Sequence, residues 1–342
     1  MIPYTRKTLP NGLTVVVNRD RASKLAAVNI LYRVGARNEN PARTGFAHLF
    51  EHLMFRGTRA VENFDLPVQM ASGDNNAFTN NDYTDFYITL PKDNLETALW
   101  LESDRMEGLD ITPAKLEAEK KVVIEEFRQR YLNQPYGDQT MLLRALAYKV
   151  HPYRWAAIGL ATDHIAGATL ADVESFYRAH YRPSNAILSI SADMEEERML
   201  ELAEKWFAPL ADHPSATAAI PQEPVQTQAR RQEVERDVPA STVTVAYHMC
   251  ARTKPDFYTA DLVSDLLSGG DSGRLYTHLV KERNLLSSVN AYITGDVDPG
   301  LFVFTGQLLP GVTPEAAEAA FREEIEALQT TAATAYEIEK VK

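Results

Sequence analysis

Residues 44–58 read TGFAHLFEHLMFRGT, a stretch that predicts one short helix followed by a sharp turn. Thr44 is suited to cap the helix, which we expect to run to about Arg56, and Gly57 is suited to end it. Apolar side chains occupy most of its remaining positions: Phe46, Leu49, Phe50 and Leu53. A helix that is apolar around most of its girth is expected to be buried.

One face of this helix carries two histidines and a glutamate, because residues at i, i+3 and i+4 are neighbours on a helix: His48, Glu51 and His52. Such side chains are costly to bury unless a partner satisfies them. Two histidines one turn apart can bind one zinc ion, each through a ring nitrogen. Zinc lowers the pKa of a bound water to about 7, and a nearby carboxylate can accept the water's proton. We therefore interpret the segment as a zinc site with Glu51 as general base, in preference to buried histidines without a metal.

A catalytic zinc ion needs a third protein ligand and an open position for water. The sequence predicts a helix over residues 113–131, which begins with a capping threonine and a first-turn proline. On this helix Glu119 and Glu126 share a face with two valines, whereas Glu125 lies about 100° away from Glu126. Glu119 and Glu126 are therefore the candidates, one as the third ligand and the other as its support.

The rest of the chain is expected to mix strands and helices. Asn11-Gly12 between two short apolar runs predicts a tight hairpin. Further strands are expected over residues 26–34, 77–79, 85–90, 186–191, 243–249, 286–294 and 301–308. Further helices are expected over residues 93–107, 138–149, 170–180, 195–208, 256–268, 273–283 and 314–329.

A stretch without helical or strand periodicity separates two regions and is rich in Pro, Ala, Thr and Gln. After it the order of elements restarts. We therefore expect an α+β fold in which the second region repeats the arrangement of the first. The expected parts are a zinc-bearing catalytic domain over 1–215, a linker over 216–232 and a second domain over 233–342. The second region is about half as long as the first, so it is either a smaller domain or an incomplete repeat of the first, and we favour the incomplete repeat.

The composition of the 342 residues is that of a globular protein, with a formal net charge of −12 that argues against nucleic acid as a partner. No apolar run approaches the roughly 20 residues that span a bilayer, so we expect no membrane span. The N-terminus lacks the pattern of a signal peptide, which favours a soluble protein. The single cysteine, Cys250, excludes an internal disulfide and a multi-cysteine metal site.

At these residues the sequence resembles the insulinase/pitrilysin family of inverted zinc peptidases, whose motif is H-x-x-E-H. Residues 35–58 are similar to the family signature through their two glycines and the closing Gly-Thr. Residues 119–126, EKKVVIEE, resemble the family's E-x-x-x-V-x-x-E segment, whose last glutamate is the third ligand. The resemblance implies two homologous α/β-sandwich units, each a mostly antiparallel sheet with helices packed on it. It also implies one Zn²⁺ per chain, held by His48, His52 and Glu126. It further implies Glu51 as general base and Glu119 as a supporting carboxylate. The sequence does not determine the compartment, for which the bacterial cytoplasm and periplasm are the two candidates.

Residues 75–79, NNAFT, resemble the family's N-A-x-T edge strand, on which an extended peptide adds as a further strand. The resemblance implies that Asn76, Ala77 and Phe78 bind a peptide substrate. Such β-augmentation recognises backbone more than side chains. The alternative is an ordinary strand that follows an asparagine-rich turn.

The second region departs from the family in one respect. Active members carry an arginine and a tyrosine seven residues apart there, which bind the substrate carbonyl and stabilise the oxyanion. In the matching stretch, residues 279–289 (LVKERNLLSSV), these positions hold Val280 and Ser287. Arg283 and Lys281 are the nearby cations that could compensate in part. We therefore expect the zinc-bearing subunit of a heterodimer, similar to a bacterial processing-peptidase-like subunit, whose homologous partner supplies the missing pair.

The function expected is that of a zinc-dependent endopeptidase that hydrolyses peptides or unfolded polypeptide segments. Two alternatives stay open. One is a non-catalytic structural subunit of a larger complex, like the core proteins that this family contributes to respiratory complexes. The other is a processing enzyme that removes targeting presequences, which uses the same chemistry.

Overall fold

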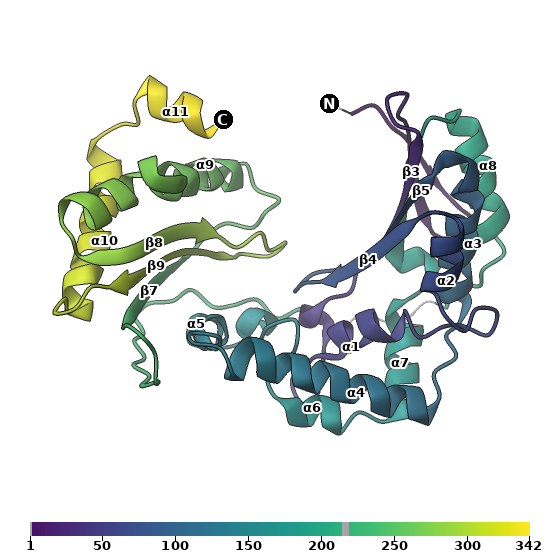
Figure 1. The fold of residues 1–342 in the computed structure, drawn as a ribbon, viewed down its shortest axis with the longest axis horizontal. Coiled ribbons are helices and arrows are strands. Elements are labelled where there is room, and N and C mark those ends of the chain that lie inside the picture. The colour runs from purple at the N-terminus through teal and green to yellow at the C-terminus, as the bar shows by residue number, and fades with distance from the viewer. Residues whose placement is uncertain (1, 214–218) are drawn as a thin grey trace. The chain divides into compact units, whose positions relative to one another are not determined.

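The structure, a computed structural model, describes residues 2–213 and 219–342, which form two compact units (Figure 1). The first unit comprises Met1–Gln134 and Tyr148–Gln226, and the second comprises Pro135–Ala147 and Thr227–Lys342. Each unit contains a β-sheet and several helices, so the expected α+β class is confirmed. Within the described residues, no helix combines the length and the apolar character needed to cross a membrane.

The sheet of the first unit has six strands in the order β1-β2-β6-β3-β5-β4. They are β1 (Thr5–Thr8), β2 (Thr14–Arg19), β3 (Leu25–Tyr32), β4 (Asp74–Thr79), β5 (Thr84–Pro91) and β6 (Ala186–Ala192). Neighbouring strands are antiparallel except β2 and β6, which run parallel. Buried and partly exposed residues alternate along β6, as expected where one face of a sheet packs on helices. Strand β4 forms one edge of the sheet.

The hairpin between β1 and β2 is present, but its turn is longer than the two residues expected from Asn11-Gly12. The amide of Gly12 donates to the carbonyl of Leu9, so Pro10 and Asn11 form the centre of the turn. Gly12 follows with φ +89°, a conformation that a residue without a Cβ adopts readily.

The described residues of the first unit form seven α-helices: α1 (Phe46–Leu53), α2 (Asp65–Met70), α3 (Leu95–Glu107), α4 (Pro113–Phe127), α6 (Thr162–Ala166), α7 (Leu170–His180) and α8 (Glu196–Phe207). Figure 1 shows α1 lying along α4. Phe50 of α1 is fully buried, and its ring stacks on Phe176 and Tyr181 with centroids 5.3 and 5.2 Å apart. The apolar girth of α1 thus anchors it in the core, as its sequence predicts.

Two details of α1 differ from the expectation. Thr44 does not cap the helix, because Gly45 is the N-cap residue, with φ +92°. The Thr44 hydroxyl instead accepts from the amide of Leu160 at 2.7 Å and lies 2.8 Å from His164 Nδ1. The helix also ends at Leu53, three residues earlier than expected, in a turn that leads to Gly57.

Helix α4 follows its sequence signals closely. The Thr112 side chain accepts from the amide of Lys115 at 3.2 Å, and Pro113 occupies the first turn. After Phe127 the chain continues as a wider helical turn, Arg128–Leu132, which matches the expected end near residue 131.

The second unit has a three-stranded antiparallel sheet in the order β7-β9-β8. Its strands are β7 (Thr242–His248), β8 (Leu286–Ile293) and β9 (Leu301–Leu308). Its α-helices are α5 (Gln139–Ala147), α9 (Asp256–Ser268), α10 (Pro314–Thr330) and α11 (Ala335–Val341), and Tyr276–Glu282 forms a wide π-helical turn. Leu267, Leu279, Phe304 and Phe321 lie at the centre of its core.

Helix α5 falls inside the range expected for the first domain but packs with the second unit. Tyr136, just before it, donates its hydroxyl to the carbonyl of Ala240 at 2.7 Å and accepts from Gln307 at 3.0 Å. The expected boundary between residues 215 and 216 lies outside the described residues. The division into 1–215, 216–232 and 233–342 stays a prediction.

Candidate metal centre

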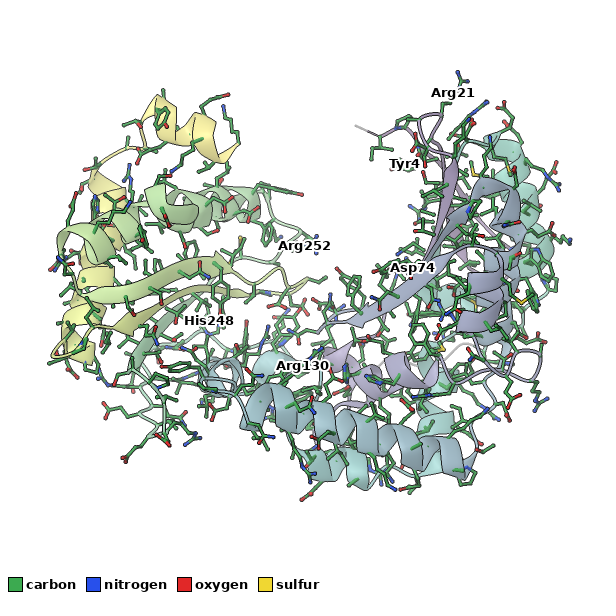
Figure 2. The ribbon with its side chains drawn as sticks, in the orientation of Figure 1. Tyr4, Arg21, Asp74, Arg130, His248 and Arg252 are labelled. Atoms are coloured by element: carbon green, nitrogen blue, oxygen red, sulfur yellow. The ribbon has the colours of Figure 1, made fainter. Side chains whose placement is uncertain are left out.

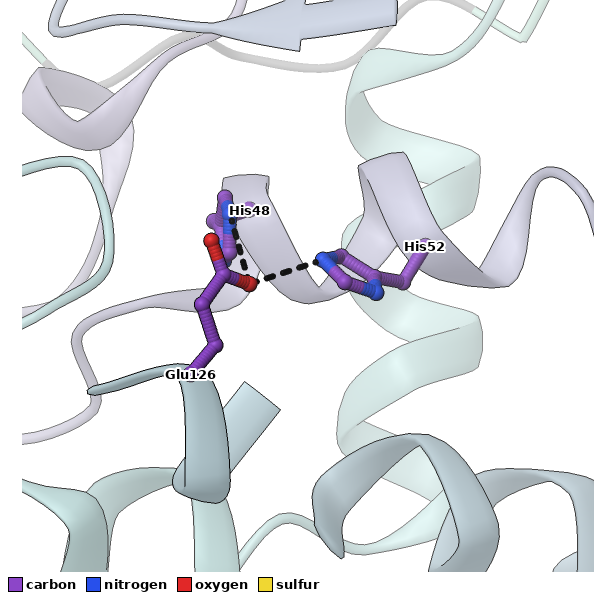
Figure 3. Close-up of side chains that lie close together, drawn as sticks. All are labelled: His48, His52 and Glu126. Carbon is purple, nitrogen blue, oxygen red and sulfur yellow. Dashed lines mark ion pairs between the residues drawn. The ribbon is translucent and has the colours of Figure 1, made fainter. Parts of the chain in front are cut away.

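Two histidines of α1 and a glutamate of α4 meet at one point (Figure 3). His48 Nε2 lies 3.6 Å and His52 Nε2 lies 3.3 Å from the same Glu126 oxygen, Oε2. One ligand atom from each of the three residues falls within 4.8 Å of the others. In the part of the chain that the structure describes, this is the one group of three such side chains with that spacing.

The three side chains fit a zinc ion. Ligands about 2.0–2.1 Å from one ion in a tetrahedral arrangement lie roughly 3.3 Å apart, close to the separations between Glu126 and the two histidines. Two imidazole nitrogens and one carboxylate oxygen also form a ligand set that catalytic zinc uses, with a fourth position left for water.

Glu119 lies next to His52, on the side of its ring opposite Glu126. Its Oε2 lies 3.5 Å from His52 Nδ1, the ring nitrogen that faces away from Glu126. Its Oε1 lies 2.5 Å from the guanidinium of Arg56. Glu119 is almost fully buried, with 1% of its surface exposed. A carboxylate on the far nitrogen of a histidine ligand fixes the ring and its tautomer, so Glu119 has the geometry of a support rather than a ligand.

The charges of the metal-free site are strongly perturbed. Burial lowers the pKa of His48 to about 4, although Glu126 opposes the change. Burial also lowers the pKa of His52, but its contacts with Glu119 and Glu126 outweigh burial and raise the value to about 9. The contact with His52 lowers the pKa of Glu126. Metal ligands must be deprotonated, so metal binding at this site should weaken as the pH falls.

Glu51 lies beside this group on the same helix, and burial raises the pKa of its carboxyl. The Thr79 side chain, at the end of β4, hydrogen-bonds to it and opposes the rise. Glu51 also faces a cavity of about 500 Å³. The cavity is lined by Glu51, His52, Phe55, Arg56, Glu62, Asn63, Asp65, Lys115 and Glu119.

The candidate substrate residues Asn76, Ala77 and Phe78 lie on β4, which pairs with β5 on one side only. Phe78 is 43% exposed. The Asn76 side chain accepts from the amide of Ala77 at 2.8 Å. An edge strand with open backbone groups is a template on which another strand can add.

Sequence reasoning missed a further acidic side chain, Glu39. It is 6% exposed and accepts from the amides of Gly45 and Ala47, both at 2.9 Å, at the start of α1. Burial raises its pKa, and hydrogen bonds from its neighbours, first among them the backbone amides of Ala47 and Gly45, oppose the rise. Local sequence signals look for a cap directly before a helix, so a residue six positions upstream of Gly45 gave no signal.

Thr79 and Arg56 were also missed as neighbours of the site. Thr79 is the last residue of the N-A-x-T pattern, which could have pointed to it. Arg56 follows α1, and nothing in its local sequence indicates an ion pair with Glu119.

The four residues that replace or neighbour the family's arginine and tyrosine all make contacts inside the second unit. Val280 packs against its core, and Ser287 donates to Gln307 Oε1 at 3.1 Å. Lys281 lies over the ring of Tyr276, and Arg283 lies 2.6 Å from Glu323.

Comparison with known proteins places these observations in context. Residues 14–155 match a family described as insulinase (peptidase family M16), and residues 167–342 match one described as peptidase M16 inactive domain. The chain is 33% identical over 341 residues to the zinc protease PqqE of Helicobacter pylori, and this alignment covers 98% of this chain and 77% of that protein. It is 26% identical over 315 residues to a probable mitochondrial-processing peptidase subunit beta of Arabidopsis thaliana, covering 88% of this chain and 59% of that one.

A solved structure gives the same picture. The crystal structure of a protease from Helicobacter pylori superposes with a TM-score of 0.95 at 31% identity, and the match covers 100% of this chain and 83% of that one.

Proposed function

This chain belongs to the insulinase family, peptidase family M16, and on that premise we propose that it is the zinc-bearing subunit of an endopeptidase. Its substrates are peptides or unfolded polypeptide segments. The proposal rests above all on the meeting of His48, His52 and Glu126 within 4.8 Å. The relative named a zinc protease supports the choice of metal, one ion per chain.

His48, His52 and Glu126 would hold the ion. When bound, zinc supplies an acidified water and polarises the substrate carbonyl. Glu51 takes the proton from the attacking water at its carboxylate, and its raised pKa suits this role, because a better base holds the proton more firmly. Glu119 holds the His52 ring. Arg130, labelled in Figure 2, lies 3.0 Å from Glu126 Oε1, so that Oε2 faces both histidines.

The substrate binds in extended form along β4. The backbone of Asn76, Ala77 and Phe78 would pair with the peptide, and the Asn76 side chain would release the Ala77 amide to do so. The Thr79 contact with Glu51 links the end of this strand to the general base. The cavity beside Glu51 and His52 offers room for a substrate side chain.

A partner subunit completes the enzyme. Val280 and Ser287 cannot bind a carbonyl or an oxyanion as an arginine and a tyrosine do. Lys281 and Arg283 make contacts within the second unit, which limits their freedom to compensate. A homologous subunit that lacks zinc ligands would supply the pair, and a relative whose name calls it a subunit supports this arrangement.

A second candidate function is a non-catalytic subunit of a larger complex. The description of the family that matches residues 167–342, an inactive domain, favours it. The set of His48, Glu51, His52 and Glu126 in the other unit argues against it, because a subunit without catalysis has no need of all four.

The test is a peptide-library digest with the chain alone, with the chain co-expressed with such a homologous partner, and with Glu51→Gln in both preparations. We expect weak cleavage by the lone chain, strong cleavage with the partner, and a loss of about 10²–10⁴-fold with Glu51→Gln. Full activity of the lone chain would contradict the heterodimer. No Glu51-dependent cleavage in either preparation would contradict the peptidase. Preferential cleavage of basic presequences would favour the processing role over general degradation.

A further inference from the structure

The first turn of α1 has an unusual source of hydrogen-bond acceptors. The first four amides of an α-helix have no partner within the helix and need one from elsewhere. Gly45 has no side chain to offer, and the Thr44 hydroxyl is engaged by Leu160 and His164. Glu39 meets the need: Oε2 accepts from the amide of Gly45 and Oε1 from that of Ala47.

Glu39 is itself held by its surroundings. It follows the short helical turn Ala36–Asn38, and its amide donates to the carbonyl of Ala36 at 3.2 Å. The Trp155 indole donates to the same carbonyl at 3.0 Å. The amide of Ala36 donates to the carbonyl of Asn80, in the loop between β4 and β5. The support for the first turn of α1 is therefore connected to the sheet edge.

The two histidines differ in what orients them. His52 is held by Glu119 at its Nδ1. The Nδ1 of His48 is buried and has no hydrogen-bond partner among the described residues. His48 is the third residue of an eight-residue helix, in the turn that frays first if its amides are unsatisfied. Its position therefore depends on how firmly the backbone of this turn is fixed.

We propose that Glu39 is a positioning residue of the metal centre, whose carboxyl fixes the first turn of α1 and so places His48 within ligand distance of Glu126. Glu39 does for His48, through the backbone, what Glu119 does for His52 through its side chain. This inference rests on the proposed zinc site. It concerns the affinity of the site for metal and does not require that the lone chain be active.

The direct test measures zinc affinity by competition with a chromogenic chelator in the wild-type chain, Glu39→Gln and Asp172→Asn. Glutamine keeps one acceptor but presents an amide N–H to the other backbone donor. Asp172 is a matched control, because its carboxylate accepts from the amide of Thr169 at the start of α7, a helix without ligands. Both variants should lower the melting temperature. Only Glu39→Gln should weaken zinc binding. The expected loss is about tenfold or more, as is typical when a residue that supports a metal ligand is substituted.

The outcomes separate this inference from the proposed function. A wild-type chain that binds no zinc would contradict the zinc site itself. Wild-type affinity in Glu39→Gln, while His48→Ala loses zinc, would overturn the inference alone. If Glu39→Gln does not fold, amide hydrogen exchange in the metal-free wild-type chain decides: Gly45 and Ala47 should exchange as slowly as Leu49 inside the helix. Exchange at the rate of open loop amides would overturn the inference.

Discussion

The two units of the chain share a core arrangement of strands but differ in what their helices carry. In the first unit β3, β5 and β4 lie side by side and antiparallel, and in the second β7, β9 and β8 do the same. A helix follows the first strand in each. In α1 that helix holds His48, Glu51 and His52, whereas α9, DFYTADLVSDLLS, holds no histidine. Among the described residues, the same arrangement thus carries a candidate metal centre in one unit and not in the other, as expected where a few side chains add a site to a fold.

The difference extends to what stabilises each unit. In the first, the nearly buried His48 and Glu119 lie inside the packing between α1 and α4, where unpaired polar groups are costly. In the second, Leu267, Leu279 and Phe321 belong to a core of buried apolar side chains. We therefore predict that metal binding stabilises the first unit and leaves the stability of the second unit unchanged.

Metal removal should produce the largest difference in melting temperature between the two units. A ligand present at a thousand times its dissociation constant stabilises the folded state by about 4 kcal/mol, so a chelator should lower the melting temperature of the first unit by many degrees. The second unit should melt as before. Calorimetry with and without chelator, with hydrogen exchange to assign each transition, measures this. Equal shifts of both transitions would contradict the contrast.

Shortening a core side chain of the second unit should destabilise that unit and leave the first unit unchanged. Phe321→Ala removes a fully buried ring from α10 and should destabilise the second unit by about 3–5 kcal/mol. Zinc binding by the first unit should be unchanged. Urea unfolding monitored in each unit, together with a zinc titration, tests this, and loss of zinc affinity would mean that the two units are not independent.

A smaller effect is expected from pH. Burial, with a contribution from Arg182, lowers the pKa of His180 to about 4, below its ordinary value of 6.5. The unfolded chain therefore binds a proton at this residue at a higher pH than the folded chain does. The stability contribution is present above pH 6.5 and is lost as the pH falls towards 4, an effect of about 3 kcal/mol. His180→Phe should flatten the acid dependence of the first unit over this range, and an unchanged slope would contradict the assignment.

The sequence predicted those parts of the site that follow from helical periodicity. His48, Glu51 and His52 share a face because of their spacing on α1, and Glu126 is brought to them by a helix with clear start signals. The role of Thr44 was wrong, because the left-handed conformation of Gly45 moved the cap position and the hydroxyl bonded elsewhere.

The sequence did not predict features that depend on contacts between residues far apart in the chain. The sequence of α5 predicts a helix correctly, but periodicity does not say which sheet a helix packs against, and tertiary contacts such as that of Tyr136 with Ala240 decide it. Glu39 is likewise an ordinary acidic residue until the fold places it at the amides of Gly45 and Ala47.

The central claim is that the first unit holds one zinc ion through His48, His52 and Glu126. The most direct measurement is elemental analysis of the purified wild-type chain, His48→Ala and His278→Ala. His278 is a matched control in the second unit, where it lies 2.9 Å from Glu324 and belongs to no metal group among the described residues. The account predicts close to one equivalent of zinc in the wild type and His278→Ala, and almost none in His48→Ala. A metal-free wild type, or full zinc content in His48→Ala, would contradict it.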